Sequence, residues 1–314
     1  MSNQRGSLLM TALASGVLGI GVVIGSMWML QDTPEQDANG TEISVEYGRA
    51  LIRETSVLMG PNHEDPAMRF SGSNLDCSSC HLDSGTKPGT LSLLGSSSRY
   101  PRFSGRDGVE GDLLDRINGC MERSMNGRKL SRDSAELRSM AAYVESLGDQ
   151  YAAMGATRRA ADEPPAFNEP PRAADPEAGL LVYEQRCQVC HGDNGQGLQA
   201  TLDIREGYLF PPLWGPDSFN DGAGMHRVLT AANFIKARMP LGQPDLTDDE
   251  AFDVAAYINS TERPKMANLE EDYPDRTLKP VDGPYGPYAD PFPIEQHRLG
   301  PFGPIREFYR NLEQ

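Results

Sequence analysis

The pattern of apolar and polar residues predicts helices in the first half of the chain. Residues 46–59 form an amphipathic segment that Gly60-Pro61 should end. A second helix, or a helix followed by a turn, is predicted over residues 112–124. A capping-box-like sequence at residues 133–136 starts a third helix, which Gly148 should stop. Its apolar face consists of Leu137, Met140, Val144 and Leu147.

The same pattern predicts helices in the second half. Asp175, Pro176 and Glu177 suit a helix start, because they supply an N-cap, a proline at the first position and an acid in the first turn. Thr247 and Glu250 cap a closing helix. Two apolar stripes at helical spacing should face the core, namely Met225, Val228, Leu229, Ala232 and Ile235, and then Phe252, Ala255, Ala256 and Ile258.

The N-terminal part contains a long uncharged run. Residues 8–30 are 23 residues without a charge, which is enough to span a bilayer as a transmembrane helix. A cleaved signal peptide is the alternative, but the run ends in Met27-Trp28-Met29-Leu30, a poor cleavage site. Either interpretation of residues 1–41, membrane anchor or signal segment, exports the rest of the chain.

The net charge limits the possible partners. The chain carries a formal charge of −16, so nonspecific nucleic-acid binding is excluded and anions are repelled at long range. An anionic substrate therefore needs a local basic pocket. Residues 99–132 contain eight Lys or Arg against five Asp or Glu, a balance of +3. A solvated surface with ordinary ion pairs is the alternative explanation of this window.

Four of the five cysteines lie in two Cys-x-x-Cys-His motifs. These pentads are residues 77–81 and 187–191. Thiols at this spacing can add to the two vinyl groups of a haem, and the adjacent histidine then becomes the proximal iron ligand. A redox dithiol or a zinc half-site is less consistent, since both copies carry the histidine and neither has another Cys/His pair at zinc spacing. The sequence thus predicts two covalently bound haem c groups, attached through Cys77, Cys80, Cys187 and Cys190, with His81 and His191 as iron ligands.

The order helix, pentad, loop and helix is typical of a class I cytochrome c domain. We therefore predict an all-α fold with two such domains in tandem, an N-terminal transmembrane helix and an irregular tail that wraps the domains. The predicted segments are residues 42–150 for the first domain, 151–172 for a linker, 173–264 for the second domain and 265–314 for the tail.

The distal iron ligands are expected to differ between the two domains. Met239 lies in a Met-Pro sequence 48 residues beyond His191, the usual distal arrangement, and His226, Lys236 and Met225 are its competitors. The first domain has no Met-Pro loop. Cys120, 39 residues beyond His81, is the candidate there, with Met121 and Met125 as alternatives. A thiolate should hold the first haem at low potential.

The surroundings of Cys120 suggest chemistry. On a helix, Arg116 and Ser124 would share its face, with Arg123 beside it. Guanidinium groups bind oxyanions through paired hydrogen bonds. The alternative is that Cys120 is a buried inert thiol and that the arginines hold haem propionates.

From about residue 45 to 264, the sequence resembles the dihaem thiosulfate dehydrogenases. The resemblance rests on RINGCMERSMNG at residues 116–127, FPPLWG at 210–215, and Gly224-Met225 through Met239-Pro240. It implies that His81 and Cys120 ligate the first haem, and that two thiosulfate ions are oxidised to tetrathionate with release of two electrons.

The resemblance also implies individual roles. Cys120 would be able to carry a sulfur adduct, and Arg106, Arg116 and Ser124 fall where the family contacts substrate. Some members place a lysine directly before the distal methionine and exchange the two on reduction. Here that residue is Arg238, whose guanidinium stays protonated, which favours plain His191/Met239 ligation.

The expected protein is a periplasmic, membrane-anchored thiosulfate dehydrogenase. It would pass electrons to an external acceptor such as another cytochrome c, and would not bind nucleic acid. Members of the family also differ in how far they favour tetrathionate reduction. The alternatives are a non-catalytic dihaem electron carrier serving an oxidase, with methionine at both irons, and a dihaem peroxidase, which needs a displaceable distal ligand.

Overall fold

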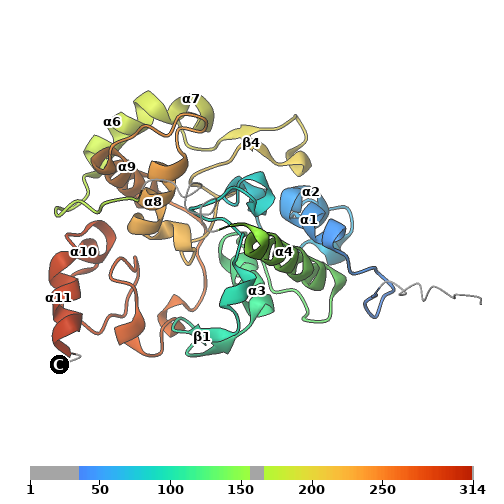
Figure 1. Ribbon diagram of the computed structural model, residues 1–314. Coiled ribbons are helices and arrows are strands. Elements are labelled where there is room, and N and C mark those ends of the chain that lie inside the picture. Colours follow the sequence, from blue (N-terminus) through green and yellow to red (C-terminus); the bar gives the residue numbers. More distant parts are fainter. Residues whose placement is uncertain (1–34, 156–165, 313–314) are drawn as a thin grey trace, which may run out of the picture. The chain divides into compact units, whose positions relative to one another are not determined.

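The computed structural model describes residues 35–155 and 166–312 (Figure 1). The segment at residues 8–30, predicted to be a membrane helix, lies outside this part of the chain. No helix within the described ranges is both long and apolar enough to cross a membrane.

The first haem-binding region contains α1 (Val45–Arg53), α2 (Thr55–Met59), α3 (Leu113–Arg123) and α4 (Ala135–Ala153). The single helix predicted over residues 46–59 is interrupted at Glu54, whose φ and ψ are −127° and 42°. This break places the Thr55 hydroxyl beside the first pentad, where it donates to the Leu51 carbonyl (2.7 Å) and accepts from the Cys77 amide (3.1 Å). Helix α4 packs against α1 and α3 and buries the predicted face that begins at Leu137.

Helix α3 begins as predicted, whereas α4 ends later than predicted. Asp112 caps α3 in a box with Asp115, which fixes the helical register of the residues that follow. The stop predicted at Gly148 is wrong, because α4 continues to Ala153. Gly148 is instead a close-contact position, where an added Cβ would lie 2.2 Å from Ser97 Oγ.

The second haem-binding region contains α6 (Pro176–Arg186), α7 (Gln188–His191), α8 (Val228–Arg238) and α9 (Asp248–Ser260). Asp175 and Thr247 cap α6 and α9 as predicted. Helices α6 and α8 both pack on α9, and Phe252, Ala255 and Ala232 are fully buried between them.

Two small antiparallel pairs of strands modify the all-α prediction. Strand β1 (Arg102–Ser104) pairs with β2 (Val109–Gly111), and β3 (Leu198–Gln199) pairs with β4 (Tyr208–Phe210). Short 3-10 turns connect the larger elements, at Pro66–Met68, Cys77–Ser79, Asp83–Gly85, Ser97–Arg99, Ile204–Glu206, Gly224–His226, Leu269–Glu271 and Arg276–Leu278.

The tail is more regular than predicted. It forms α10 (Ile294–Leu299) and α11 (Gly303–Leu312), so the prediction of an irregular tail is wrong for these residues. Phe302 and Ile305 are buried in the core of the second region. Asp272 pairs with Arg123 of α3, and the tail therefore contacts both haem-binding regions.

Candidate active site

The two pentad histidines are held in the orientation that iron ligation requires. His81 Nδ1 donates to the Leu91 carbonyl at 2.6 Å, and His191 Nδ1 donates to the Pro211 carbonyl at 2.8 Å. Burial lowers the pKa of both imidazoles, which keeps them neutral. With Nδ1 committed, each Nε2 keeps its lone pair for a metal, the arrangement found for metal-binding histidines.

The pentad cysteines are available for covalent attachment. Cys77, Cys80, Cys187 and Cys190 are all free of disulfide bonds. Burial raises the pKa of Cys77 to about 12, and those of Cys80 and Cys187 to about 11. The donor set of each pentad thus fits a haem attached through two thioethers with a histidine on the iron.

Cys120 lies beside the first pentad and beside Arg116. Burial is the largest cause of the raised pKa of Cys77 and of Cys80, and the charge of Cys120 raises both further. The Cys120 sulfur is therefore close to both thiols. Cys120 is also the largest cause of the raised pKa of Arg116, one helical turn earlier on α3. The structure therefore brings together the lone cysteine, the attachment thiols and a guanidinium group.

Ser124 marks the end of α3, one turn after Cys120. Its amide donates to the Cys120 carbonyl at 2.8 Å, and its side chain is half-buried. The alternative distal ligands Met121 and Met125 are 1% and 3% exposed and pack in the first core.

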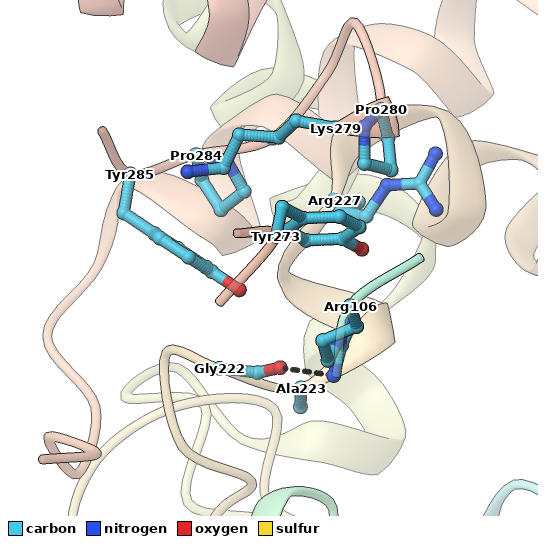
Figure 2. Close-up of a pocket in the computed structure, with 10 residues that line it drawn as sticks. Arg106, Gly222, Ala223, Arg227, Tyr273, Lys279, Pro280, Pro284 and Tyr285 are labelled. Carbon is cyan, nitrogen blue, oxygen red and sulfur yellow. Dashed lines mark hydrogen bonds between the residues drawn. The ribbon is translucent and has the colours of Figure 1, made fainter. Parts of the chain in front are cut away.

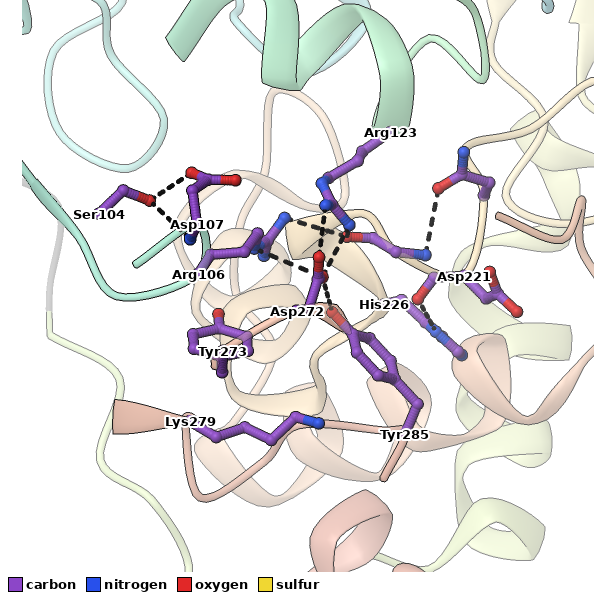
Figure 3. Close-up of polar contacts among 12 residues, drawn as sticks. Ser104, Arg106, Asp107, Arg123, Asp221, His226, Asp272, Tyr273, Lys279 and Tyr285 are labelled. Carbon is purple, nitrogen blue, oxygen red and sulfur yellow. Dashed lines mark hydrogen bonds and ion pairs between the residues drawn. The ribbon is translucent and has the colours of Figure 1, made fainter. Parts of the chain in front are cut away.

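Arg106 lies between β1 and β2 and comes close to Arg116. The two like charges interact, since Arg106 acts to lower the pKa of Arg116 against the larger effect of Cys120. Arg106 Nη1 donates to the Gly222 carbonyl at 3.3 Å, and its Nε lies 3.9 Å from Asp272 Oδ2 (Figure 3). Arg116 is thus close to Cys120, and Arg106 is close to Arg116 and tethered to the second haem-binding region through Gly222.

Arg123 does not join them. The sequence placed it beside Cys120 as a possible second guanidinium, but it forms a buried two-bond ion pair with Asp272, at 2.9 and 2.8 Å. The expectation that Arg123 binds substrate is therefore not supported, because its donors are occupied by the tail (Figure 3).

In the second region, Met239 caps the end of α8 and is half-buried against the core that also contacts Cys187. Of its competitors, Lys236 has another partner, since its Nζ donates to the Leu246 carbonyl at 2.7 Å. His226 Nδ1 donates to the Asp221 carbonyl at 2.8 Å, and Met225 packs against the same core as Met239. Burial lowers the pKa of His226 to about 4. Met239 remains our predicted ligand.

Comparison with known proteins identifies the family. The SoxA/TsdA cytochrome c domain model matches residues 70–151, and the model for the cbb3-type cytochrome c oxidase subunit III matches residues 174–258. A thiosulfate dehydrogenase from Allochromatium vinosum is 44% identical over 222 residues, covering 69% of this chain and 79% of the relative. The chain belongs to the thiosulfate dehydrogenase family.

Two further relatives agree. A thiosulfate dehydrogenase from Stutzerimonas stutzeri is 38% identical over 251 residues, covering 79% of this chain and 77% of the relative. The solved structure of thiosulfate dehydrogenase TsdBA from Marichromatium purpuratum aligns with a TM-score of 0.61 and 33% identity. It covers 76% of this chain, which spans 49% of the solved chain. The chain thus has two cytochrome c domains and carries two haem c groups, as sequence analysis predicted; the exact domain boundaries stay predictions.

The tail supplies site residues that sequence analysis missed. Arg106 lines a small cavity with Tyr273, Lys279 and Tyr285 (Figure 2). The Tyr285 hydroxyl donates to Asp272 at 2.6 Å, and Lys279 lies over the Tyr285 ring at 4.6 Å. Burial lowers the pKa of Lys279 to about 8. The signal that the sequence offers is the density of tyrosines around these charges.

Proposed function

We propose that this member of the thiosulfate dehydrogenase family oxidises two thiosulfate ions to tetrathionate and passes two electrons to an external cytochrome. The observation that carries the proposal is the position of Cys120, which interacts with both thiols of the first pentad and with Arg116. An electron carrier with methionine at both irons would leave this free thiol without a role.

The arginines would recognise the substrate. Thiosulfate carries two negative charges and three sulfonate oxygens, and guanidinium groups bind such oxyanions through paired hydrogen bonds. We assign this role to Arg106 and Arg116, with the Ser124 hydroxyl as a further donor. Because the chain has a charge of −16, these cations must offset long-range repulsion locally.

Cys120 would carry the covalent step. Its thiolate forms a bond with the sulfane sulfur of the first thiosulfate, a two-electron oxidation whose electrons the external cytochrome finally accepts. The second thiosulfate attacks that sulfur, the bond to Cys120 breaks, and tetrathionate departs with the thiolate restored. Tetrathionate reduction is the reverse of the same steps and uses the same residues.

The residues assigned to the irons set the direction of electron flow. We assign His81 and Cys120 to the first haem and His191 and Met239 to the second. Bound at these sites, the haems would supply one-electron acceptors. Thiolate ligation lowers a haem potential and methionine ligation raises it, so these residues would favour electron transfer from the first site to the second.

We also assign the protein to the periplasm. Covalent haem attachment suits an exported chain. The uncharged segment at residues 8–30 would anchor the chain in the inner membrane. A cleaved signal peptide is the alternative.

The proposal is tested by product analysis. Purified holoprotein is incubated with thiosulfate and a one-electron acceptor, and thiosulfate, tetrathionate and reduced acceptor are quantified. We expect two thiosulfates consumed and two acceptors reduced per tetrathionate formed. Reduction of the haems by other donors without any loss of thiosulfate would identify an electron carrier instead.

A further inference from the structure

Tyr273 of the tail is held in a backbone conformation that tyrosine rarely adopts. Its φ is 59°, in the left-handed region that glycine adopts without strain. A bulky residue persists there only where its surroundings fix it. Tyr273 is 8% exposed, and its amide donates to the Arg106 carbonyl at 2.7 Å. Glycine would make this turn and this backbone bond more easily, so the strained position indicates a use for the phenol ring.

The tail covers the loop between β1 and β2, which carries Arg106. Besides the backbone bond to Arg106, the tail approaches this loop at two further points. A Cβ added at Gly105 would lie 3.3 Å from Leu278 Cβ, and one added at Gly108 would lie 3.1 Å from Pro274 Cγ. The tail therefore helps to set the position of the Arg106 backbone.

The Tyr273 ring lies between two cations, Arg106 and Lys279 (Figures 2 and 3). The Arg106 guanidinium carbon and Lys279 Nζ are each 5.8 Å from the ring centroid. The face of an aromatic ring attracts cations at such distances. Burial lowers the pKa of Arg106, but its interactions with Tyr273, which include a side-chain hydrogen bond, and with Tyr285 raise it above the ordinary value. The ring thus contacts the Arg106 side chain as well as its backbone.

The partners of Arg106 orient its guanidinium without cancelling the charge. Asp272 Oδ2 lies 3.9 Å from Arg106 Nε, but both oxygens of Asp272 are bound by Arg123, and one also accepts from the Tyr285 hydroxyl. The phenol of Tyr273, unlike a carboxylate, carries no charge at neutral pH. Arg106 keeps 23% of its side chain exposed, so its charge stays available to a dianionic substrate.

The cavity that Tyr273 lines with Arg106 is too small for the substrate. Its volume is about 10 Å³, which gives room for about one water molecule and none for a thiosulfate ion. Tyr273 can therefore act on thiosulfate through Arg106, and not by binding the ion inside this cavity.

We propose that Tyr273 is a positioning residue for thiosulfate, which holds the Arg106 guanidinium in the orientation that binds the substrate. The inference rests on the proposed function, in which Arg106 contacts thiosulfate. It makes the tail a part of the substrate site, because the residue that fixes this arginine comes from the tail.

The test begins with Tyr273→Phe, which removes the hydroxyl and keeps the ring and the turn. Tyr309→Phe is the matched control, because Tyr309 is another tail tyrosine, whose hydroxyl donates to Asp290 at 2.5 Å. Steady-state kinetics with thiosulfate are measured on holoproteins of equal haem content. We expect Y273F to raise KM roughly 3- to 10-fold with kcat nearly unchanged, and Y309F to change neither constant. A wild-type KM in Y273F would overturn the proposal.

A double-mutant cycle shows whether Tyr273 acts through Arg106. In an Arg106→Gln background, Y273F should have no further effect on KM, because the group that the hydroxyl orients is gone. The same fold-change from Y273F with and without Arg106 would overturn the positioning role. A wild-type KM in R106Q would overturn the substrate role of Arg106 and this inference together, while thiosulfate oxidation itself would stand. Thiosulfate turnover by wild type tests that reaction separately.

Discussion

At the scale of single residues, the chemistry depends on spacing along α3. Asp112 sets the first turn of the helix through its capping box, and each residue that follows takes its place at 3.6 residues per turn. Arg116, Cys120 and Ser124 are successive fourth residues, so they lie along one face. The thiol and the guanidinium that our mechanism uses are therefore positioned by local sequence, which is why they could be predicted.

The role assigned to Arg116 predicts a specific loss. Arg116→Gln removes a charge-assisted hydrogen bond to the substrate, worth about 1.5–3 kcal/mol, and should lower kcat/KM for thiosulfate roughly 10- to 100-fold, mainly through KM. Steady-state kinetics measures this. Arg132→Gln is the matched control, because Arg132 is exposed and forms ion pairs with Asp112 and Asp115 at the start of α3. Equal kinetic constants in the two variants would show that Arg116 does not bind the substrate.

His226 gives a prediction about pH. Burial lowers its pKa from 6.5 to about 4, so between these pH values the unfolded chain binds more protons than the folded one. The free energy of unfolding should therefore fall as the pH drops through this window, by about 2 kcal/mol between pH 7 and pH 5. Urea unfolding at both pH values measures the loss. The His226→Asn variant should lack the part of this loss that His226 causes. An equal loss of unfolding free energy in both proteins would contradict the lowered pKa of His226.

At the scale of elements, the tail is fastened to α3 by a buried ion pair. Asp272→Asn leaves the Arg123 charge buried without its partner, and such changes cost about 3–5 kcal/mol. We expect this loss in the free energy of unfolding measured with urea. Glu271→Gln, at the exposed neighbouring position, is the control and should be close to neutral. A near-neutral D272N would show that the pair contributes little.

Elements whose limits are set locally were predicted well, and those set by distant contacts were not. The starts of α3, α6 and α9 follow from their N-cap residues. The sequence suggested that Gly148 would end α4, but Gly148 serves the close approach of Ser97, about 50 residues away, and the helix continues. Similarly, α11 is anchored by Ile305 in a core built from other segments.

At the scale of the whole molecule, both pentads and Cys120 could be recognised because each motif is short. The surroundings of Arg106 could not be recognised in the sequence. Asp272 and Lys279 come from the tail and reach the site through tertiary contacts. Local rules contain no information on which distant carboxylate faces which arginine. For the same reason, the sequence places Arg123 beside Cys120 but does not reveal that Asp272 binds it.

The net charge of −16 predicts how the protein meets its electron acceptor. Electrostatic attraction speeds the encounter with a basic cytochrome c. At an ionic strength of about 0.1 M, salt largely screens this attraction beyond about 10 Å. Raising the ionic strength from about 10 mM to about 0.5 M should slow reduction of such an acceptor at least ~5-fold. Ferricyanide, an anion, is the control and should not slow. A salt-independent rate with the basic acceptor would contradict electrostatic docking.

The central claim is that Cys120 is the reactive group beside the first haem. The most direct measurement is thiosulfate turnover by Cys120→Met, with Met121→Leu as a control for substitution at this point of α3. We predict that C120M keeps both haems, because both pentads are intact, and loses turnover by about 10³-fold or more, as expected when a nucleophile is removed. C120M protein that carries both haems and oxidises thiosulfate at the wild-type rate would contradict the account.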